Sequence, residues 1–142
     1  MQLNPHSAVS HSHLSRCLAF AGRHNEAIEH AEEAVRLGPF DPQKALVLGG
    51  IAVAKHAAGR FEEAVHWSIK AQHLRPGFQG SRRMLCANLT LAGRTKEAQS
   101  LLRLLRHDQP QLSIDWLQAN VPYQTADLIE RYQDAMWTAG LR

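Results

Sequence analysis

The 142-residue chain has little of what several classes of protein require. It contains two cysteines, Cys17 and Cys86, which form no C-x-x-C pair, so neither a disulfide framework nor a zinc site is indicated. Its longest apolar run, residues 45–54, has ten residues, whereas a membrane-spanning helix needs about 20. The first residues lack the basic and apolar parts of a signal peptide. We therefore expect a soluble, cytoplasmic protein without a membrane partner.

Motifs that carry catalysis or hold a cofactor are also missing. The sequence has no Gly-x-Ser-x-Gly, no cysteine near a histidine at a helix start and no phosphate-binding glycine loop. Nine histidines are present, but the closest two, His11 and His13, would point to different sides of a helix. We expect solvated or partly packed histidines, and no catalytic residue, metal or cofactor. The protein is predicted not to be an enzyme.

What the chain does contain is an internal repeat. The heptapeptide AGRHNEA at 21–27 returns as AGRFEEA at 58–64 and as AGRTKEA at 92–98. The glycines of these three heptapeptides are separated by 37 and 34 residues, which is the spacing of stacked helical hairpins. Four prolines follow the same spacing: Pro5, Pro39, Pro76 and Pro110. Each unit is therefore predicted to be one helical hairpin.

Small residues recur at matching positions of the units. Amphipathic spacing predicts two helices in each unit, with the glycine of the heptapeptide ending the first helix in a left-handed conformation. The small side chains fall into two equivalent sets, which are Ser15, Ala52 and Cys86 on the first helices and Ala27, Ala64 and Ala98 on the second helices. With side chains this short, two helices can approach closely.

Together these marks resemble the tetratricopeptide repeat over residues 8–110. Three pairs stand where that family has its Leu-Gly or Leu-Ala pair: Leu14-Ser15, Ile51-Ala52 and Leu85-Cys86. The family's aromatic positions are replaced, for example by Leu18, Lys55 and Leu89 where it has a tyrosine. The resemblance implies an all-α fold, a right-handed α-solenoid with repeat units at 8–41, 42–78 and 79–110. Residues 1–7 look like the remnant of a preceding repeat, so we expect a piece of a longer protein.

Residues 111–142 are predicted to be C-terminal capping helices. The segment LSIDWLQANVP reads as a short helix that stacks on the third unit, and Thr125 can cap a final helix that extends through Ala139. The aromatic residues of this part are expected to cover the third unit: Trp116, Tyr123, Tyr132 and Trp137. The ending also resembles the C-terminal closure of repeat arrays attached to bacterial adenylate or guanylate cyclases and to winged-helix regulators.

In arrays of this type the first helices line a concave groove. By phase, the inward residues are Val9, Ser12, Arg16, Phe20, Leu46, Gly49, Val53, His56, Gly80, Arg83, Ala87 and Thr90. Arg16 and Arg83 can hold a carboxylate between them, and His56 is expected to add positive charge at lower pH. We therefore predict a non-catalytic protein–protein interaction module that presents the groove to a peptide or partner protein. It would form the C-terminal part of a larger bacterial regulatory protein.

Two alternatives remain open at this point. The first is an RNA-binding array like the pentatricopeptide repeats, because residues 82–106 carry six basic residues and one acid. Three units would read only about three bases, so nucleic acid is the less favoured partner. The second alternative is a regulatory tail of an adenylate cyclase that has no separate ligand. In that case upstream domains absent from this sequence would cover the groove by an intramolecular contact.

Overall fold

The computed structural model describes residues 8–37, 44–76, 79–121 and 123–142, and the regular secondary structure within these ranges consists of helices. The predicted all-α fold is confirmed. The eight helices are α1 (Ala8–Phe20), α2 (His24–Leu37), α3 (Lys44–Ala57), α4 (Phe61–Leu74), α5 (Gln79–Leu91), α6 (Thr95–Asp108), α7 (Ile114–Asn120) and α8 (Ala126–Ala139). None of these helices is both long enough and apolar enough to cross a membrane.

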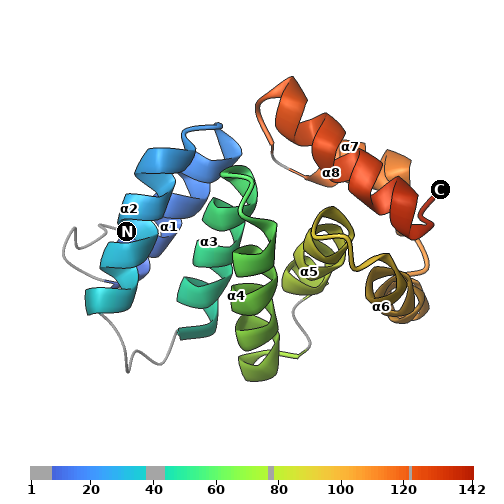
Figure 1. The fold of residues 1–142 in the computed structure, drawn as a ribbon, viewed down its shortest axis with the longest axis horizontal. Helices are drawn as coiled ribbons and strands as arrows, with labels where there is room; N and C mark the ends of the chain where they lie inside the picture. The colour runs from blue at the N-terminus through green and yellow to red at the C-terminus, as the bar shows by residue number, and fades with distance from the viewer. Residues whose placement is uncertain (1–7, 38–43, 77–78, 122) are drawn as a thin grey trace.

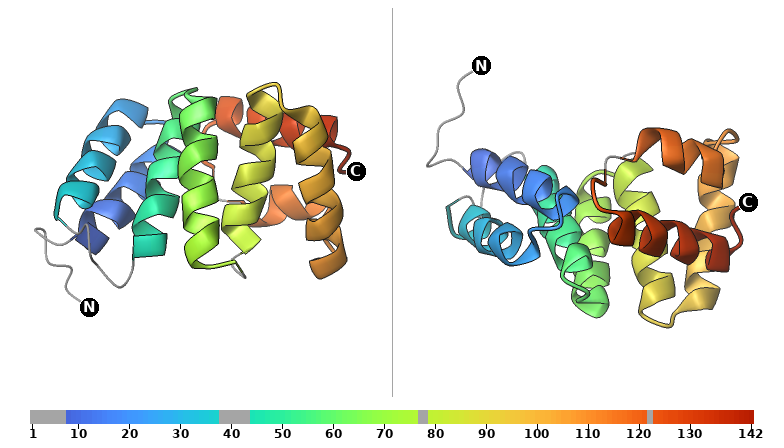
Figure 2. Two further views of the ribbon diagram at one scale, coloured as in Figure 1. Left: turned by 60° about the horizontal axis from the view of Figure 1, so that its bottom comes forward. Right: turned by 90° about the horizontal axis from the view of Figure 1, so that it is seen from above.

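The first six helices form three hairpins that stand side by side (Figure 1). Within the hairpins α1 packs on α2, α3 on α4 and α5 on α6, and successive hairpins meet through α3 against α1 and α2 and through α5 against α4. Helix α8 lies across α5 and α6, and α7 packs on α8 (Figures 1 and 2). The array is thus a helical solenoid, and the two C-terminal helices depart from its hairpin order.

The repeated heptapeptide forms the turn of each hairpin. Gly22, Gly59 and Gly93 have φ angles of 83°, 78° and 83°, which lie in the left-handed region that favours glycine. In the first turn the amide of Arg23 donates to the carbonyl of Leu18 at 2.8 Å, and the arginines after the other two glycines make the same bond. The sequence-based prediction of where the first helices end is confirmed.

The arginine and glutamate of each heptapeptide lie next to each other at the start of the second helix. Arg23 pairs with Glu26 at 2.7 Å and Arg60 with Glu63 at 3.9 Å, while Arg94 bonds Glu97 in the third turn. These pairs are exposed to solvent, which screens them, so they add little to stability. Among the residues repeated in the three turns, the glycine and the final alanine therefore matter most for the fold. The alanine is buried in all three hairpins.

Small side chains bring the two helices of each hairpin into contact, as predicted. All six of the matching small residues are buried. The hydroxyl of Ser15 donates to the carbonyl of Ala27 at 2.6 Å, and the thiol of Cys86 lies 3.5 Å from the carbonyl of Ala98. A side chain longer than these would occupy the space of the facing helix backbone, so the positions accept only small residues.

Leu14 differs from its counterparts in the later hairpins. Its side chain is 44% exposed, whereas Ile51 and Leu85 at the equivalent positions are 4% and 6% exposed. Helix α3 packs on α2 and α5 packs on α4, but no described helix precedes α1. The equivalent apolar position therefore stabilises the second and third hairpins more than the first.

The two C-terminal helices begin at side-chain caps. The Ser113 hydroxyl accepts a hydrogen bond from the Trp116 amide at 3.0 Å, and the Thr125 hydroxyl accepts one from the Leu128 amide at 3.4 Å. The predicted start of the last helix at Thr125 is confirmed. Beyond α8, Leu141 is buried and the carbonyl of Arg142 accepts from the Ile114 amide at 3.3 Å, which ties the chain end to α7.

The expectation that four aromatic residues cover the third hairpin is wrong for two of them. Trp116 lies against Arg83 of α5, but Trp137 is 52% exposed, and Tyr123 contacts Phe20 of α1 and His56 of α3. For Tyr123 the reason is that the described residues before α8 lie at the turn of the first hairpin, where the Gln124 amide donates to the Phe20 carbonyl. Sequence periodicity carries no information about such a contact.

Candidate binding site on the inner face

The first helices of the hairpins, α1, α3 and α5, share one side of the layer, here called the inner face. The α7–α8 linker lies on this face. The Gln124 amide donates to the Phe20 carbonyl at 2.9 Å, and the Tyr123 ring has its centroid 4.9 Å from that of Phe20 and 5.9 Å from that of His56. A Cβ atom at Gly22 would lie 2.9 Å from the Thr125 methyl carbon. Gly22 is therefore favoured for two reasons: its φ angle is positive, and a side chain there would crowd Thr125.

Two arginines fasten the C-terminal helices to the hairpins. Arg131 of α8 donates to the His56 carbonyl at 2.5 Å, and its guanidinium lies 5.1 Å from the ring centroid of Phe61. Arg83 of α5 lies 4.8 Å from the ring centroid of Trp116 and donates to the Gln109 side chain at 3.0 Å. Cation–π contacts of this kind contribute about 0.5–2 kcal/mol each, depending on desolvation. The two arginines thus hold the C-terminal helices to the second and third hairpins.

Six of the twelve residues predicted for the groove line one cavity of about 150 Å³ on the inner face: Arg16, Phe20, Gly49, Val53, Gly80 and Arg83. They come from α1, α3 and α5, as the repeat phase indicates. The remaining lining residues are Ala52, Ser68, Met84, Asn120, Val121 and Tyr132. Asn120, Val121 and Tyr132 belong to the C-terminal segment and were not part of the sequence-based set, because their position depends on the path of the linker.

The other six predicted residues have different surroundings. Ser12, His56 and Ala87 are buried, so they present no open surface in this arrangement. Thr90 is half-buried, and its hydroxyl donates to the Cys86 carbonyl one turn earlier at 3.2 Å. The side chains of Val9 and Leu46 lie outside the described part of the chain. The open part of the inner face is therefore narrower than the repeat phase alone suggests.

The charged side chains that line the inner-face cavity are all positive. Arg16 and Arg83 line it, and none of the other described residues that line it is charged. Burial lowers the pKa of the Arg16 guanidinium, but an arginine stays protonated in proteins near neutral pH. Phe20, Val53 and Met84 supply apolar walls. A site of this kind favours a ligand that combines a negative group with an apolar part.

His56 is neutral on this face and does not add the charge that was expected at lower pH. Burial lowers its pKa to about 4, and its Nδ1 lies 2.6 Å from the Asn88 side-chain oxygen. Because that oxygen can only accept, Nδ1 carries the proton of the neutral ring and Nε2 is left as an acceptor. Neither His56 Nε2 nor Asn88 Nδ2 has a hydrogen-bond partner among the described residues.

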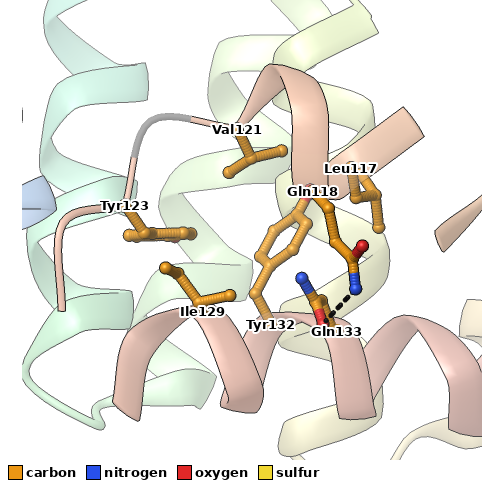
Figure 3. A pocket seen from close by; sticks show the side chains of 7 residues that line it. All are labelled: Leu117, Gln118, Val121, Tyr123, Ile129, Tyr132 and Gln133. Carbon is orange, nitrogen blue, oxygen red and sulfur yellow. Dashed lines mark hydrogen bonds between the residues drawn. The ribbon is translucent and has the colours of Figure 1, made fainter. Parts of the chain in front are cut away.

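A second cavity, of about 340 Å³, lies between α7 and α8 (Figure 3). Its lining residues are Leu117, Gln118, Val121, Tyr123, Ile129, Tyr132 and Gln133. The Gln118 amide nitrogen donates to the Gln133 side-chain oxygen at 3.4 Å, and the buried Tyr123 hydroxyl has no hydrogen-bond partner among the described residues. No sequence motif predicted this cavity, which depends on how α7 and α8 pack.

The basic stretch of residues 82–106 does not gather on the inner face. Arg82 is buried and pairs with Asp108 at 2.6 Å, and Arg94 bonds Glu97 and lies 3.6 Å from Glu62. Lys96, Arg103 and Arg106 are exposed on α6, and none of them lines the cavity of the inner face. Of the predicted basic residues, only Arg83 points to the candidate site.

Histidines form one close pair elsewhere. The Nδ1 atoms of His11 in α1 and His30 in α2 lie 2.9 Å apart. Within the described ranges, no group of three or more histidine, cysteine, aspartate or glutamate side chains is placed to hold a metal ion. The pair therefore contributes to the contact between α1 and α2, and two histidines alone do not make a metal site.

The chain is a helical-repeat protein: it has three hairpins with matching turns, and a cavity lies on the side of their first helices. A family model described as tetratricopeptide repeat matches residues 6–72, which include the first two hairpins, and α5 and α6 repeat the same turn and the same small-residue contact. The match covers just under half of the chain, and it supports a tetratricopeptide-repeat protein. This family suggests a scaffold for protein interactions and is generally non-catalytic. No curated protein matches the sequence.

Proposed function

We propose that the chain is a non-catalytic interaction module that binds a carboxylate-bearing segment of a partner protein in the inner-face cavity. The observation that carries this proposal is the convergence of Arg16 and Arg83, from the first and third hairpins, on one cavity without an acidic residue in its described lining. A guanidinium fork matches a carboxylate with two parallel hydrogen bonds. The partner residue would be aspartate, glutamate or a chain terminus.

The size of the cavity supports insertion of one residue of the partner. Its volume of about 150 Å³ is roughly five times the share of one water in the liquid, about 30 Å³. A carboxylate side chain fits that space, with its methylene groups against Phe20 and Val53. The rest of the partner segment would follow the open rim of the inner face. In this proposal the module acts in the cytoplasm as the C-terminal part of a bacterial regulatory protein.

A second candidate function is that the inner face serves the chain itself. The α7–α8 linker already contacts α1 and α3, through Gln124 at the Phe20 carbonyl and Tyr123 at Phe20 and His56. On this view the C-terminal helices complete the array and no separate ligand binds. It shares with the alternative of a regulatory tail the absence of a separate ligand, but here the chain's own C-terminal residues, and not upstream domains, cover the groove.

Selection from a random peptide display library on the full chain tests the first proposal. We expect enrichment of peptides with an aspartate, a glutamate or a free terminal carboxylate, and weaker binding of those peptides to Arg16→Gln by at least about tenfold. The matched control is Arg103→Gln, since Arg103 is exposed on α6, and it should bind as the unaltered chain does. Failure to enrich any peptide would favour the second candidate.

A further inference from the structure

The cavity between α7 and α8 is larger than the inner-face cavity and distinct from it. The two share only Val121 and Tyr132, which stand between them. Figure 3 shows α7 above and α8 below the space, with the rings of Tyr123 and Tyr132 and the amides of Gln118 and Gln133 around it. Its volume, about 340 Å³, is in the range of sites that hold small molecules, roughly 300–1,000 Å³.

The walls of this cavity carry no charge. Leu117, Val121 and Ile129 are aliphatic, and the two glutamines do not ionise. Burial raises the pKa of both tyrosines above the ordinary value, so their hydroxyls stay protonated at neutral pH. Arg83 and Arg131 interact with Tyr132 and Tyr123 but do not line the cavity. A charged ligand would therefore lose its hydration here without a counterion among the lining residues, which is costly. The ligand that fits is therefore uncharged.

Some polar side chains of the cavity make weak hydrogen bonds, or none, to other described residues. Tyr123 is only 6% exposed, and its hydroxyl has no partner among the described residues. A buried hydroxyl without a hydrogen bond costs about 1–3 kcal/mol, and such groups are rare in folded proteins. The bond between Gln118 and Gln133 is long, at 3.4 Å, so both amides can turn to another partner at little cost.

We propose that the α7–α8 cavity is a binding site for a small uncharged aromatic molecule that carries an amide or a similar hydrogen-bonding group. The aromatic ring packs against the aliphatic walls and the edges of the tyrosine rings. The polar group reaches the Tyr123 hydroxyl or the two glutamine amides. This inference is independent of peptide binding at the inner face, because it rests on a different cavity.

Titration with benzamide, followed by NMR of the tyrosine ring carbons, tests this site on the full chain. The sequence contains two tyrosines, and both line the cavity. Tyr132 also lines the inner-face cavity, whereas Tyr123 does not, so the Tyr123 signals distinguish the two sites. We expect a saturable shift of the Tyr123 ring signals. Benzoate, which has the same shape and a negative charge, should bind at least about tenfold more weakly.

Two neighbouring substitutions on α8 provide a matched pair. Gln133→Trp places an indole at the cavity wall and should weaken benzamide binding by at least about tenfold. Asp134→Trp alters an exposed residue that does not line the cavity, and it should leave binding unchanged. Tyr123→Phe removes the hydroxyl alone and should weaken binding about five- to tenfold, while the Tyr132 signals still report the complex.

Three outcomes would overturn the proposal. The first is the absence of a saturable shift at Tyr123, and the second is equal binding of benzoate and benzamide. The third is equal benzamide affinity of Gln133→Trp and Asp134→Trp. Each of these results is compatible with peptide binding at Arg16, so failure at this cavity does not count against the proposed function.

Discussion

His56 of α3 and Asn88 of α5 form a buried hydrogen bond of 2.6 Å between two successive hairpins. Burial keeps the imidazole neutral by lowering its pKa to about 4, and the bond to Asn88 opposes this shift only in part. In the unfolded chain the same ring titrates near its ordinary value of about 6.5. The unfolded state therefore binds more protons than the folded state between pH 6.5 and 4.

Stability should consequently depend on pH through His56. The contribution of the neutral ring is fully present above about pH 6.5 and is lost progressively as the pH falls toward 4, by up to about 3 kcal/mol. Urea denaturation at pH 7 and at pH 4.5 measures the loss. His56→Gln can still donate to Asn88 but does not titrate, so it should lose less stability over this interval. Identical losses for the two proteins would contradict this account of His56.

The close approach within hairpins predicts a large effect at Ala64. This residue is fully buried where α4 meets α3, and Ala64→Arg would combine overpacking with a buried charge, so it should destabilise the fold by several kcal/mol. Arg94→Ala changes a partly exposed side chain whose ion pairs are screened by solvent, so it should leave stability nearly unchanged. Melting followed by circular dichroism compares the two variants. Equal melting temperatures would show that the hairpins do not pack as described.

The equivalent residues Leu14 and Ile51 provide a second comparison. Ile51→Ala removes a buried side chain between α3 and the first hairpin and should cost about 2–5 kcal/mol. Leu14→Ala removes a half-exposed side chain and should cost less, about 1 kcal/mol. Chemical denaturation of both variants measures the difference. A larger cost at Leu14 than at Ile51 would contradict the order of burial along the array.

Two substitutions of Tyr123 distinguish the contribution of its ring to stability from that of its hydroxyl. Tyr123→Phe deletes a buried hydroxyl without a partner, so the ligand-free protein should be unchanged or more stable by up to about 1 kcal/mol. Tyr123→Ala also removes the ring contacts with Phe20 and His56 and should cost about 3–5 kcal/mol. Thermal denaturation of the two variants checks this order. Marked destabilisation by Tyr123→Phe would mean that the hydroxyl has a partner in solution.

The local features of the fold were predictable from the sequence because local chemistry determines them. A glycine that must adopt a positive φ angle, such as Gly59, marks the end of a helix, and a recurring small residue such as Ala64 marks a close contact. The start of α8 at Thr125 follows from the ability of its hydroxyl to accept a backbone hydrogen bond. The glycine and the small residue repeat with the period of the hairpins, so three copies support those two predictions, whereas the cap at Thr125 occurs once.

The path of the α7–α8 linker was not predictable in the same way. It depends on contacts between residues far apart in the sequence, such as Gln124 with Phe20 and Arg131 with His56. The linker occurs once, so no repeat period reveals it. The burial of His56 and the contribution of Tyr132 to both cavities follow from that path.

The most direct test of the central claim is a double-mutant cycle between Arg16 and the carboxylate of a peptide selected on the full chain. Binding is measured by calorimetry for the unaltered chain and for Arg16→Gln, each with the acidic peptide and with its carboxamide counterpart. We expect a coupling free energy of about 1.5–3 kcal/mol, as for a charge-assisted hydrogen bond. A coupling energy near zero, with both peptides still bound, would contradict a carboxylate site at Arg16.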